Sequence, residues 1–232
     1  MTDDLLGLSL APGDEHYRAY VGPPADYDLV SAMTFGLLTA CGLRQHHTLL
    51  DVGCGSLRLG RLLIPYLNPA KYIGLEPNKW LIDDGLRYEV GASLADIRQP
   101  QFIYDTSLAS LSPETRIDYA VAQSIFSHTA PDLLAQWVRE ISGFLSPAGI
   151  LLATVIPGES DFTGEGWIYP ECVEYRIESV AAVAAEHGLA FQVLDWFHPR
   201  QVWCAFYQPG FDAGILNNGK PSWNNYGVVS PR

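Results

Sequence analysis

The feature that most constrains the fold is a strand, a glycine turn and a helix that follow one another directly. Residues 48–52 are an apolar run typical of a buried strand, and they end in Gly53-Cys54-Gly55. The next apolar residues recur at the spacing of one helical face: Leu59, Leu62, Leu63, Tyr66 and Leu67. Because parallel sheets are built from strand–helix crossovers, this segment predicts an α/β fold.

The same alternation of strands and helices continues along the chain. Further strands are expected at residues 71–75, 102–104, 117–121 and 150–155, and helices at 27–41, 79–90, 131–145 and 171–187. The last two β-like runs, 191–197 and 201–207, are separated by a short turn and predict an antiparallel hairpin at one edge of the sheet. We therefore expect a mostly parallel sheet with helices on both faces.

The length of the chain indicates one domain with flanking segments. With 232 residues, the chain can form one sizeable α/β core. We expect residues 1–26, which are rich in Gly, Pro and Asp, to form a cap with a short helix near 15–20, and residues 27–208 to form the domain. Within the domain, the Gly-rich and acidic residues 157–170 are expected to be a lid or an insertion. Residues 209–232 form a tail without clear periodicity.

Charge and cysteine content narrow the class of protein. The formal net charge of -12 opposes the phosphate attraction that dominates nucleic-acid binding, so we expect no nucleic-acid partner. No apolar run is long enough to span a bilayer, and the four cysteines lie far apart, without metal-ligand spacing. Residues 1–10 carry acids in place of the basic residues of a signal peptide. We therefore expect a cytoplasmic protein that acts on a small molecule and binds no metal, with an oligomeric state that the sequence does not fix.

The glycine turn and two acidic residues indicate a nucleoside-containing cofactor. Gly53 and Gly55 allow a tight turn and close approach of backbone amides to a ligand, directly after Asp51. Glu76 ends the next strand, where a carboxylate can accept hydrogen bonds from both hydroxyls of a ribose. The dinucleotide fingerprint requires a third glycine where this chain has Arg58, which disfavours NAD.

The strings Leu49-Leu50-Asp51-Val52-Gly53-Cys54-Gly55 and Tyr72-Ile73-Gly74-Leu75-Glu76 resemble motifs I and II of the class I S-adenosylmethionine (SAM)-dependent methyltransferases. The resemblance covers residues 27–207. It implies a Rossmann-like, seven-stranded, mostly parallel sheet with an antiparallel C-terminal hairpin, and SAM as the cofactor. It also implies that Asp51, Gly53, Cys54 and Gly55 surround the methionine part of SAM, while Glu76 binds the ribose diol.

The same resemblance assigns residues to the adenine. Pro77, together with Trp80 or Leu81, would flank the ring. Asp105 follows the expected strand 102–104 and matches the acid that receives the adenine amino group, with the backbone amide of Thr106 beside it. These assignments are expectations that depend on the family pattern, because spacing alone gives no reason for them.

Two further segments would lie near the reacting end of the cofactor. Gln123 and Ser124 match the segment that passes under the sulfonium. The stretch after Gly55 departs from the commoner family pattern, because it contains Arg58 and Arg61. Either arginine could bind the SAM carboxylate bidentately, and an ion pair on the helix surface is the alternative.

Candidate catalytic residues follow from position and chemistry. His128 lies on the loop after the fourth strand and could act as a general base, with a plain helix-start residue as the alternative. Tyr17 and Tyr20 could close the pocket, unless they belong to a buried aromatic cluster. Cys54 is expected to be a packing residue, since no base accompanies it. His198, in the hairpin turn, is expected at the surface.

The reaction itself admits three alternatives. The preferred function is transfer of a methyl group from SAM to a small metabolite through oxygen, nitrogen or carbon, since methyl transfer mainly requires proximity and alignment. The second is a SAM cyclase that forms an azetidine-2-carboxylate-type amino acid and releases methylthioadenosine. The third is a catalytically silent SAM-binding protein, against which the complete motif set argues.

Overall fold

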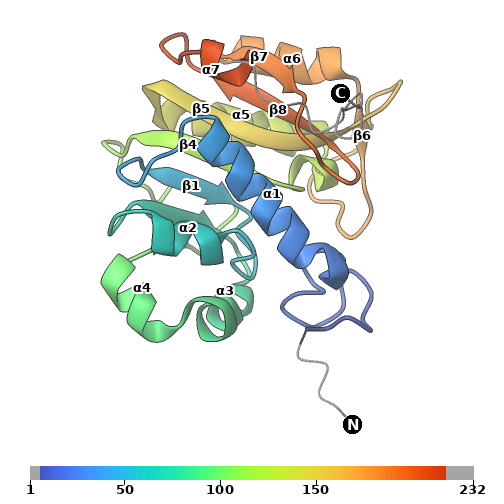
Figure 1. Ribbon diagram of the computed structural model, residues 1–232. Coiled ribbons are helices and arrows are strands. Elements are labelled where there is room, and N and C mark those ends of the chain that lie inside the picture. The colour runs from blue at the N-terminus through green and yellow to red at the C-terminus, as the bar shows by residue number, and fades with distance from the viewer. Residues whose placement is uncertain (1–5, 218–232) are drawn as a thin grey trace, which may run out of the picture.

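The computed structural model describes residues 6–217, which form a sheet of eight strands between two layers of helices (Figure 1). The strand order is β3-β2-β1-β4-β5-β8-β7, and β6 pairs with β5 outside this path. The strands are β1 (Leu49–Val52), β2 (Tyr72–Leu75), β3 (Gln101–Ile103), β4 (Ile117–Ala122), β5 (Leu145–Pro157), β6 (Glu174–Tyr175), β7 (Ala190–Leu194) and β8 (Val202–Tyr207). All pairings are parallel except those of β8 with β5 and with β7.

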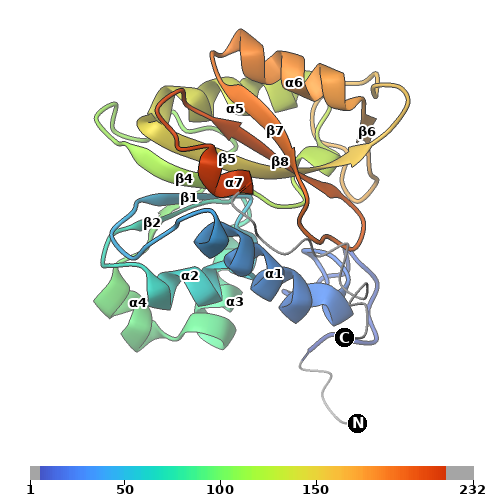
Figure 2. The same cartoon turned by 45° about the horizontal axis from the view of Figure 1, so that its top comes forward.

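The helices cover both faces of the sheet. They are η1 (Pro24–Asp26), α1 (Tyr27–Ala40), α2 (Gly60–Tyr66), α3 (Lys79–Gly85), η2 (Leu86–Val90), α4 (Ala92–Arg98), η3 (Phe126–His128), α5 (Pro131–Phe144), α6 (Ile177–Glu186) and α7 (Gly214–Asn217). Figure 2 shows α1 to α4 below the sheet and α5 and α6 above it. Within residues 6–217, no helix combines the length and the apolar composition needed to cross a membrane.

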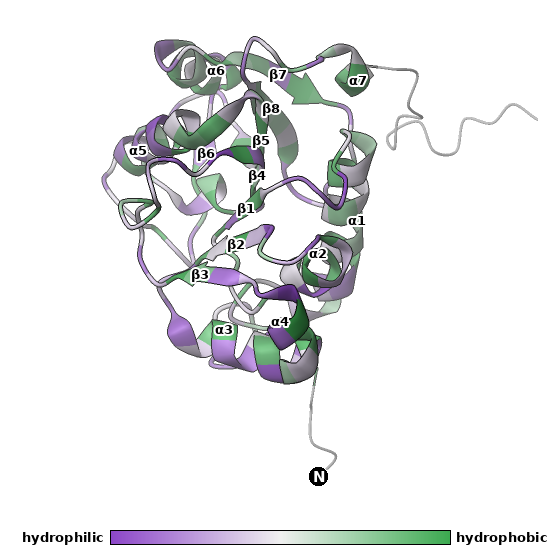
Figure 3. Cartoon of the chain, turned by 90° about the vertical axis from the view of Figure 1, so that its left-hand side faces the viewer, coloured by the Kyte–Doolittle hydropathy of each residue, from purple (hydrophilic) through white to green (hydrophobic). Residues whose placement is uncertain are grey.

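Alternation along the strands creates two apolar cores, one on each face. In β1, Leu50 and Val52 pack towards α5 and α6, whereas Leu49 packs towards α1 and α2. The amphipathic helix α5 buries Leu134, Trp137, Val138 and Ile141 and turns a hydrophilic side outward (Figure 3). Both faces of the central strands are therefore covered, which explains their nearly continuous apolar sequences.

The expected fold class is confirmed, with differences at element ends. The helix expected at 79–90 changes to a π-helical turn at η2 and stops at Gly91 (φ 85), and α4, which was not expected, follows it. The helix expected at 171–187 is shorter, because Glu174–Tyr175 pair with the long β5 and bury Tyr175. This pair is the eighth strand, where seven were expected.

The flanking segments also differ from expectation. Residues 15–20 form turns in place of a short helix, since Tyr17 and Arg18 are both held by side-chain contacts to Glu89. At the other end, the part of the tail up to residue 217 contains α7, with Ile215 against Gly42. The remainder of the tail, 218–232, lies outside the described residues.

Candidate active site

The glycine turn after β1 is packed too closely for side chains. Gly53 (φ 64) and Gly55 (φ 51) both adopt left-handed backbone conformations. A Cβ on Gly53 would lie 2.2 Å from Cδ1 of Ile125, and one on Gly55 would lie 2.6 Å from Cγ1 of Val21. The turn is therefore enclosed between the loop after β4 and the N-terminal cap, by which we mean residues 6–26.

Two buried carboxylates flank this turn. Asp51 accepts a hydrogen bond from the hydroxyl of Tyr72 at 2.8 Å, and burial raises the pKa of Asp51 to about 7. Glu76 accepts from the backbone amide of Gly55 at 3.2 Å and from the backbone and side-chain N–H groups of Asn78 at 2.9 and 2.8 Å. Burial raises the pKa of Glu76, and these donors oppose that rise. Glu76 thus ties the end of β2 directly to the glycine turn.

Cys54 lies in the same turn, and its side chain packs against the neighbouring strand β2. It is buried, and its Sγ would lie 2.8 Å from a Cβ on Gly74 of the neighbouring strand. Burial raises the pKa of the Cys54 thiol well above its ordinary value, so the thiolate is disfavoured. The geometry supports a packing role for this side chain.

Arg58 brings a positive charge into the site. Its guanidinium donates to the carbonyl of Val21 at 2.9 Å and to Oε1 of Gln123. No carboxylate within residues 6–217 forms an ion pair with it. Burial lowers the pKa of Arg58, and the charge of Asp51, which is not in direct contact with it, opposes this only in part. The site therefore has unmet capacity for an anionic group.

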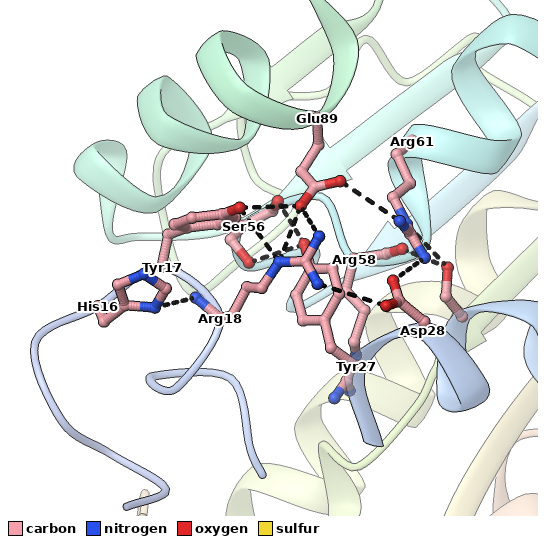
Figure 4. Close-up of polar contacts among 10 residues, drawn as sticks. His16, Tyr17, Arg18, Tyr27, Asp28, Ser56, Arg58, Arg61 and Glu89 are labelled. Carbon is pink, nitrogen blue, oxygen red and sulfur yellow. Dashed lines mark hydrogen bonds and ion pairs between the residues drawn. The ribbon is translucent and has the colours of Figure 1, made fainter. Parts of the chain in front are cut away.

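Arg61, the other arginine of this stretch, is engaged elsewhere. Four residues form a closed ring of ion pairs: Arg18–Glu89 at 2.6 Å, Glu89–Arg61 at 3.4 Å, Arg61–Asp28 at 2.6 Å and Asp28–Arg18 at 3.4 Å (Figure 4). We call this the charged ring. The side chains of Arg18 and Glu89 are only 8% and 7% exposed. The ring fastens the N-terminal cap to α1, α2 and η2.

Tyr27 connects the charged ring with the glycine turn. The guanidinium carbons of Arg18 and Arg61 lie 4.4 and 5.3 Å from the centroid of the Tyr27 ring, and its hydroxyl donates to the carbonyl of Ser56 at 3.2 Å. Tyr17 donates to Glu89 at 3.0 Å. The Tyr17 hydroxyl is thus bound within the charged ring, which supports the packing interpretation over a catalytic one.

The residues expected around adenine lie at the ends of β2 and β3. Trp80 is half-buried, Pro77 is exposed and Leu81 is buried. Asp105 is exposed, and its carboxylate accepts a hydrogen bond from the Thr106 backbone amide at 2.6 Å. The Asp105 carboxylate and the Thr106 amide therefore lie side by side. Their role in binding adenine stays a prediction.

The loop after β4 carries Gln123 and Ser124 to the same edge of the sheet. Ser124 has a left-handed backbone (φ 56), and its amide donates to Oγ1 of Thr154 on β5 at 2.7 Å. Its hydroxyl accepts hydrogen bonds from the side chains of Gln123 and Gln201. A strained, non-glycine position held by several contacts is common in functional sites.

His198 is a site residue that the sequence interpretation missed. It was expected at the surface, but it is half-buried, and its Nε2 lies 3.2 Å from Nε2 of Gln123. Burial and the charges of Arg58 and Arg200 lower the pKa of His198 to about 4. The pairing pattern could have indicated this: β8 runs antiparallel to β5 and to β7, so the β7–β8 loop returns to the carboxyl ends of the parallel strands.

His128 has the hydrogen bonding of a potential base. Its Nδ1 lies 2.6 Å from the carbonyl of Glu171, which requires the proton on Nδ1 and leaves Nε2 as an acceptor. Burial lowers the pKa of His128. Its ring lies 5.0 Å from that of Tyr169 and 5.7 Å from that of Trp167, measured between centroids. These aromatic residues belong to the segment expected to be a lid or an insertion.

Tyr20 joins the cap to the segment that follows β5. Its ring lies 5.2 Å from Trp80 and 5.8 Å from Tyr169, and its carbonyl accepts a hydrogen bond from the Tyr169 hydroxyl. The cap therefore extends from the expected adenine side of the site to the neighbourhood of His128. Within residues 6–217, no cluster of side chains could hold a metal ion.

Comparison with known proteins bears on the domain and the fold. Residues 50–151 match the model of a family described as a methyltransferase domain. Magnesium protoporphyrin IX methyltransferase from Synechocystis PCC 6803, solved with SAM, has a TM-score of 0.60 and 12% identity, over 80% of this chain and 81% of that one. A SAM-dependent methyltransferase from Clostridium acetobutylicum ATCC 824 has a TM-score of 0.59 and 13% identity, over 84% and 96%. These likenesses establish the fold.

The matched domain, the fold and the motif residues agree with one another. Residues 50–151 match a methyltransferase domain, and the fold is that of solved SAM-dependent methyltransferases.

Proposed function

We propose that this protein transfers the methyl group of SAM to a small-molecule acceptor at the carboxyl ends of β1, β2 and β4. The observation that carries the proposal is the guanidinium of Arg58, which forms no ion pair within residues 6–217, beside a glycine turn that the carboxylate of Glu76 also reaches. A ligand with a carboxylate at one end and a ribose at the other matches both groups.

The residues present suit each part of SAM. Arg58 would bind its carboxylate, since Arg61 is already paired in the charged ring. Glu76 would accept hydrogen bonds from the ribose hydroxyls, and Asp51 would face the methionine part, where an ammonium favours its ionised form. Trp80 with Pro77 or Leu81 would enclose the adenine, and Asp105 with Thr106 would bind its amino group. SAM supplies an electrophilic methyl group on a sulfonium.

His128 would then remove the proton of the acceptor. Bound SAM would supply the methyl carbon to the acceptor, and the electron pair of the broken carbon–sulfur bond would stay on sulfur. The proton of the acceptor passes to Nε2 of His128, which the bond from Nδ1 to Glu171 leaves unprotonated. The low pKa of His128 keeps the imidazole neutral, and therefore able to accept, down to mildly acidic pH.

Three observations support a small acceptor. The net charge of -12 disfavours nucleic acid. The cap and the segment after β5 meet through Tyr20 and Tyr169, which leaves a covered site more suited to a small molecule than to a protein surface. In addition, the similar Synechocystis protein is a methyltransferase of magnesium protoporphyrin IX.

The experiment is product analysis by mass spectrometry after incubation with SAM, with and without a panel of small hydroxy, amino and carbon-acid acceptors. Acceptor-dependent S-adenosylhomocysteine (SAH) is the expected product. Methylthioadenosine from SAM alone would instead identify a cyclase, and SAM binding without any product would identify a silent protein.

His128 is tested separately with the acceptor so identified. General-base assistance is worth about 10²–10⁴-fold, so His128→Gln should lower kcat by that order and leave SAM affinity nearly unchanged. A rate within about threefold of the parent would leave His128, the last residue of η3, without a role in proton transfer. Tyr20→Phe provides the matched comparison for the other candidate hydroxyl in the cap.

A further inference from the structure

The side chain of Gln123 lies between two hydrogen-bond donors that both require its single oxygen. On one side, the guanidinium of Arg58 donates to Oε1. On the other, Nε2 of His198 faces Nε2 of Gln123 at 3.2 Å. Nδ1 of His198 already accepts from the backbone amides of Arg200 and Gln201 at 3.2 and 3.0 Å. Neutral His198 therefore carries its proton on Nε2 and is a donor towards Gln123.

Neither orientation of the Gln123 amide satisfies both neighbours. With Oε1 towards Arg58, two N–H groups face each other at His198. With the amide turned over, Oε1 accepts from His198, but the amide N–H groups then face the guanidinium. Because amide orientation is decided by the surrounding hydrogen bonds, whichever group gains another acceptor decides how Gln123 lies.

A carboxylate on Arg58 would supply that acceptor. Arg58 has no ion-pair partner among residues 6–217, and a carboxylate would replace the amide oxygen with a charged and stronger acceptor. Gln123 is then free to turn Oε1 to His198 and to the hydroxyl of Ser124, which can donate to it, while the amide N–H groups can donate to the ligand. The surplus of donors disappears in this arrangement.

We propose that His198 is a positioning residue of the methyl-transfer site, an inference that rests on the proposed function. When the carboxylate of the cofactor binds Arg58, the amide oxygen of Gln123 exchanges its hydrogen bond from Arg58 for one from Nε2–H of His198. The orientation of the Gln123 amide thus depends on whether the ligand carries a carboxylate at its amino-acid end. Gln123 follows β4, in the segment expected to pass under the sulfonium. A flip of its side-chain amide therefore changes which amide atom, oxygen or nitrogen, faces the reacting end of the cofactor. In this way, cofactor binding sets the hydrogen-bonding groups that Gln123 presents towards the acceptor.

The first test compares two ligands that differ in the group concerned. SAH has the carboxylate, whereas methylthioadenosine lacks the whole amino-acid end. The pKa of His198, followed by NMR of ring-labelled histidine in the full-length protein, should rise by about 1 pH unit or more with SAH, since an anion enters near it. It should stay unchanged with methylthioadenosine. An equal response to both ligands, or to neither while SAH binds, overturns the proposal.

The second test is a double-mutant cycle on binding, measured as the ratio of the Kd of methylthioadenosine to that of SAH. His198→Asn keeps an acceptor for the two backbone amides but removes Nε2–H. The displaced Gln123 oxygen then has no new donor, so the ratio should fall about 2–12-fold, the range of one hydrogen bond. In a Gln123→Ala background, the same substitution should leave the ratio unchanged.

The outcomes separate this proposal from the proposed function. If His198→Asn leaves the ratio at its parent value, or lowers it equally in the Gln123→Ala background, His198 is not coupled to Gln123. If neither ligand binds the parent protein, the proposed function itself fails. Should either variant not fold, the NMR comparison on the parent protein still decides.

Discussion

At the scale of single residues, Asp51 is a carboxylate that the fold places in a nearly dry environment. It is 4% exposed, and within the site Tyr72 donates to it at 2.8 Å. Burial raises its pKa to about 7 from an ordinary value near 4. A raised folded-state pKa means that the native protein binds the proton more tightly than the unfolded chain does.

The sign of the pH effect follows from this. The stabilising contribution of Asp51 is fully present below about pH 4 and is lost as the pH rises to about 7. Asp51→Asn keeps an acceptor for Tyr72 without the charge. The difference in unfolding free energy, variant minus parent, should therefore increase between pH 4 and pH 7 in urea titrations. A difference that is flat over this range would contradict a raised pKa of Asp51.

Glu76 should contribute directly to ligand affinity. Glu76→Ala removes the carboxylate expected to bind the ribose hydroxyls and should weaken SAH binding by about 1–3 kcal/mol in calorimetry, the scale of hydrogen bonds to a charged group. Glu114→Ala, at an exposed acid outside the site, is the control and should leave the affinity unchanged. An unchanged affinity in the Glu76 variant would remove this residue from the site.

At the scale of elements, the charged ring holds the N-terminal cap to α1, α2 and η2 (Figure 4). Arg18→Met leaves the buried carboxylate of Glu89 with the longer ion pair to Arg61 and the hydrogen bond from the Tyr17 hydroxyl. Breaking a buried pair by removing one partner costs up to about 3–5 kcal/mol, and the contacts that persist lower this figure. We expect a loss of about 2 kcal/mol in unfolding free energy, together with faster proteolysis of the cap.

Arg87→Met is the matched control for this prediction, since Arg87 is exposed and lies outside the ring. It should change stability by less than about 0.5 kcal/mol. If the two variants behaved alike, the charged ring would not be what holds the cap.

The elements that sequence analysis predicted correctly are those with local signals. The strand before Gly53 and the helix α5 could be predicted because apolar periodicity is read within one segment. The charged ring could not, since its members come from four separate segments and each resembles a solvated surface charge in the sequence. His198 was missed for the same reason: its burial depends on where the β7–β8 loop lies relative to Gln123.

At the scale of the whole molecule, three segments distant in sequence meet over one edge of the sheet. Val21 of the cap contacts the glycine turn, Tyr169 contacts Tyr20, and His198 reaches Gln123. A ligand in this site would therefore touch segments that the sheet alone does not hold. Binding should then order the cap and stabilise the fold together.

SAH at about 100 times its Kd should raise the unfolding free energy by about 2.7 kcal/mol. For a chain of this size, that corresponds to a Tm increase of about 5–11 °C. Mass action alone gives methylthioadenosine the same effect at the same multiple of its own Kd, so the two ligands can be compared on equal terms. Proteolysis of the cap should separate them, because only SAH places a carboxylate on Arg58, whose guanidinium also holds the carbonyl of Val21. Equal protection of the cap by both ligands would show that Arg58 and the cap are not linked through the bound carboxylate.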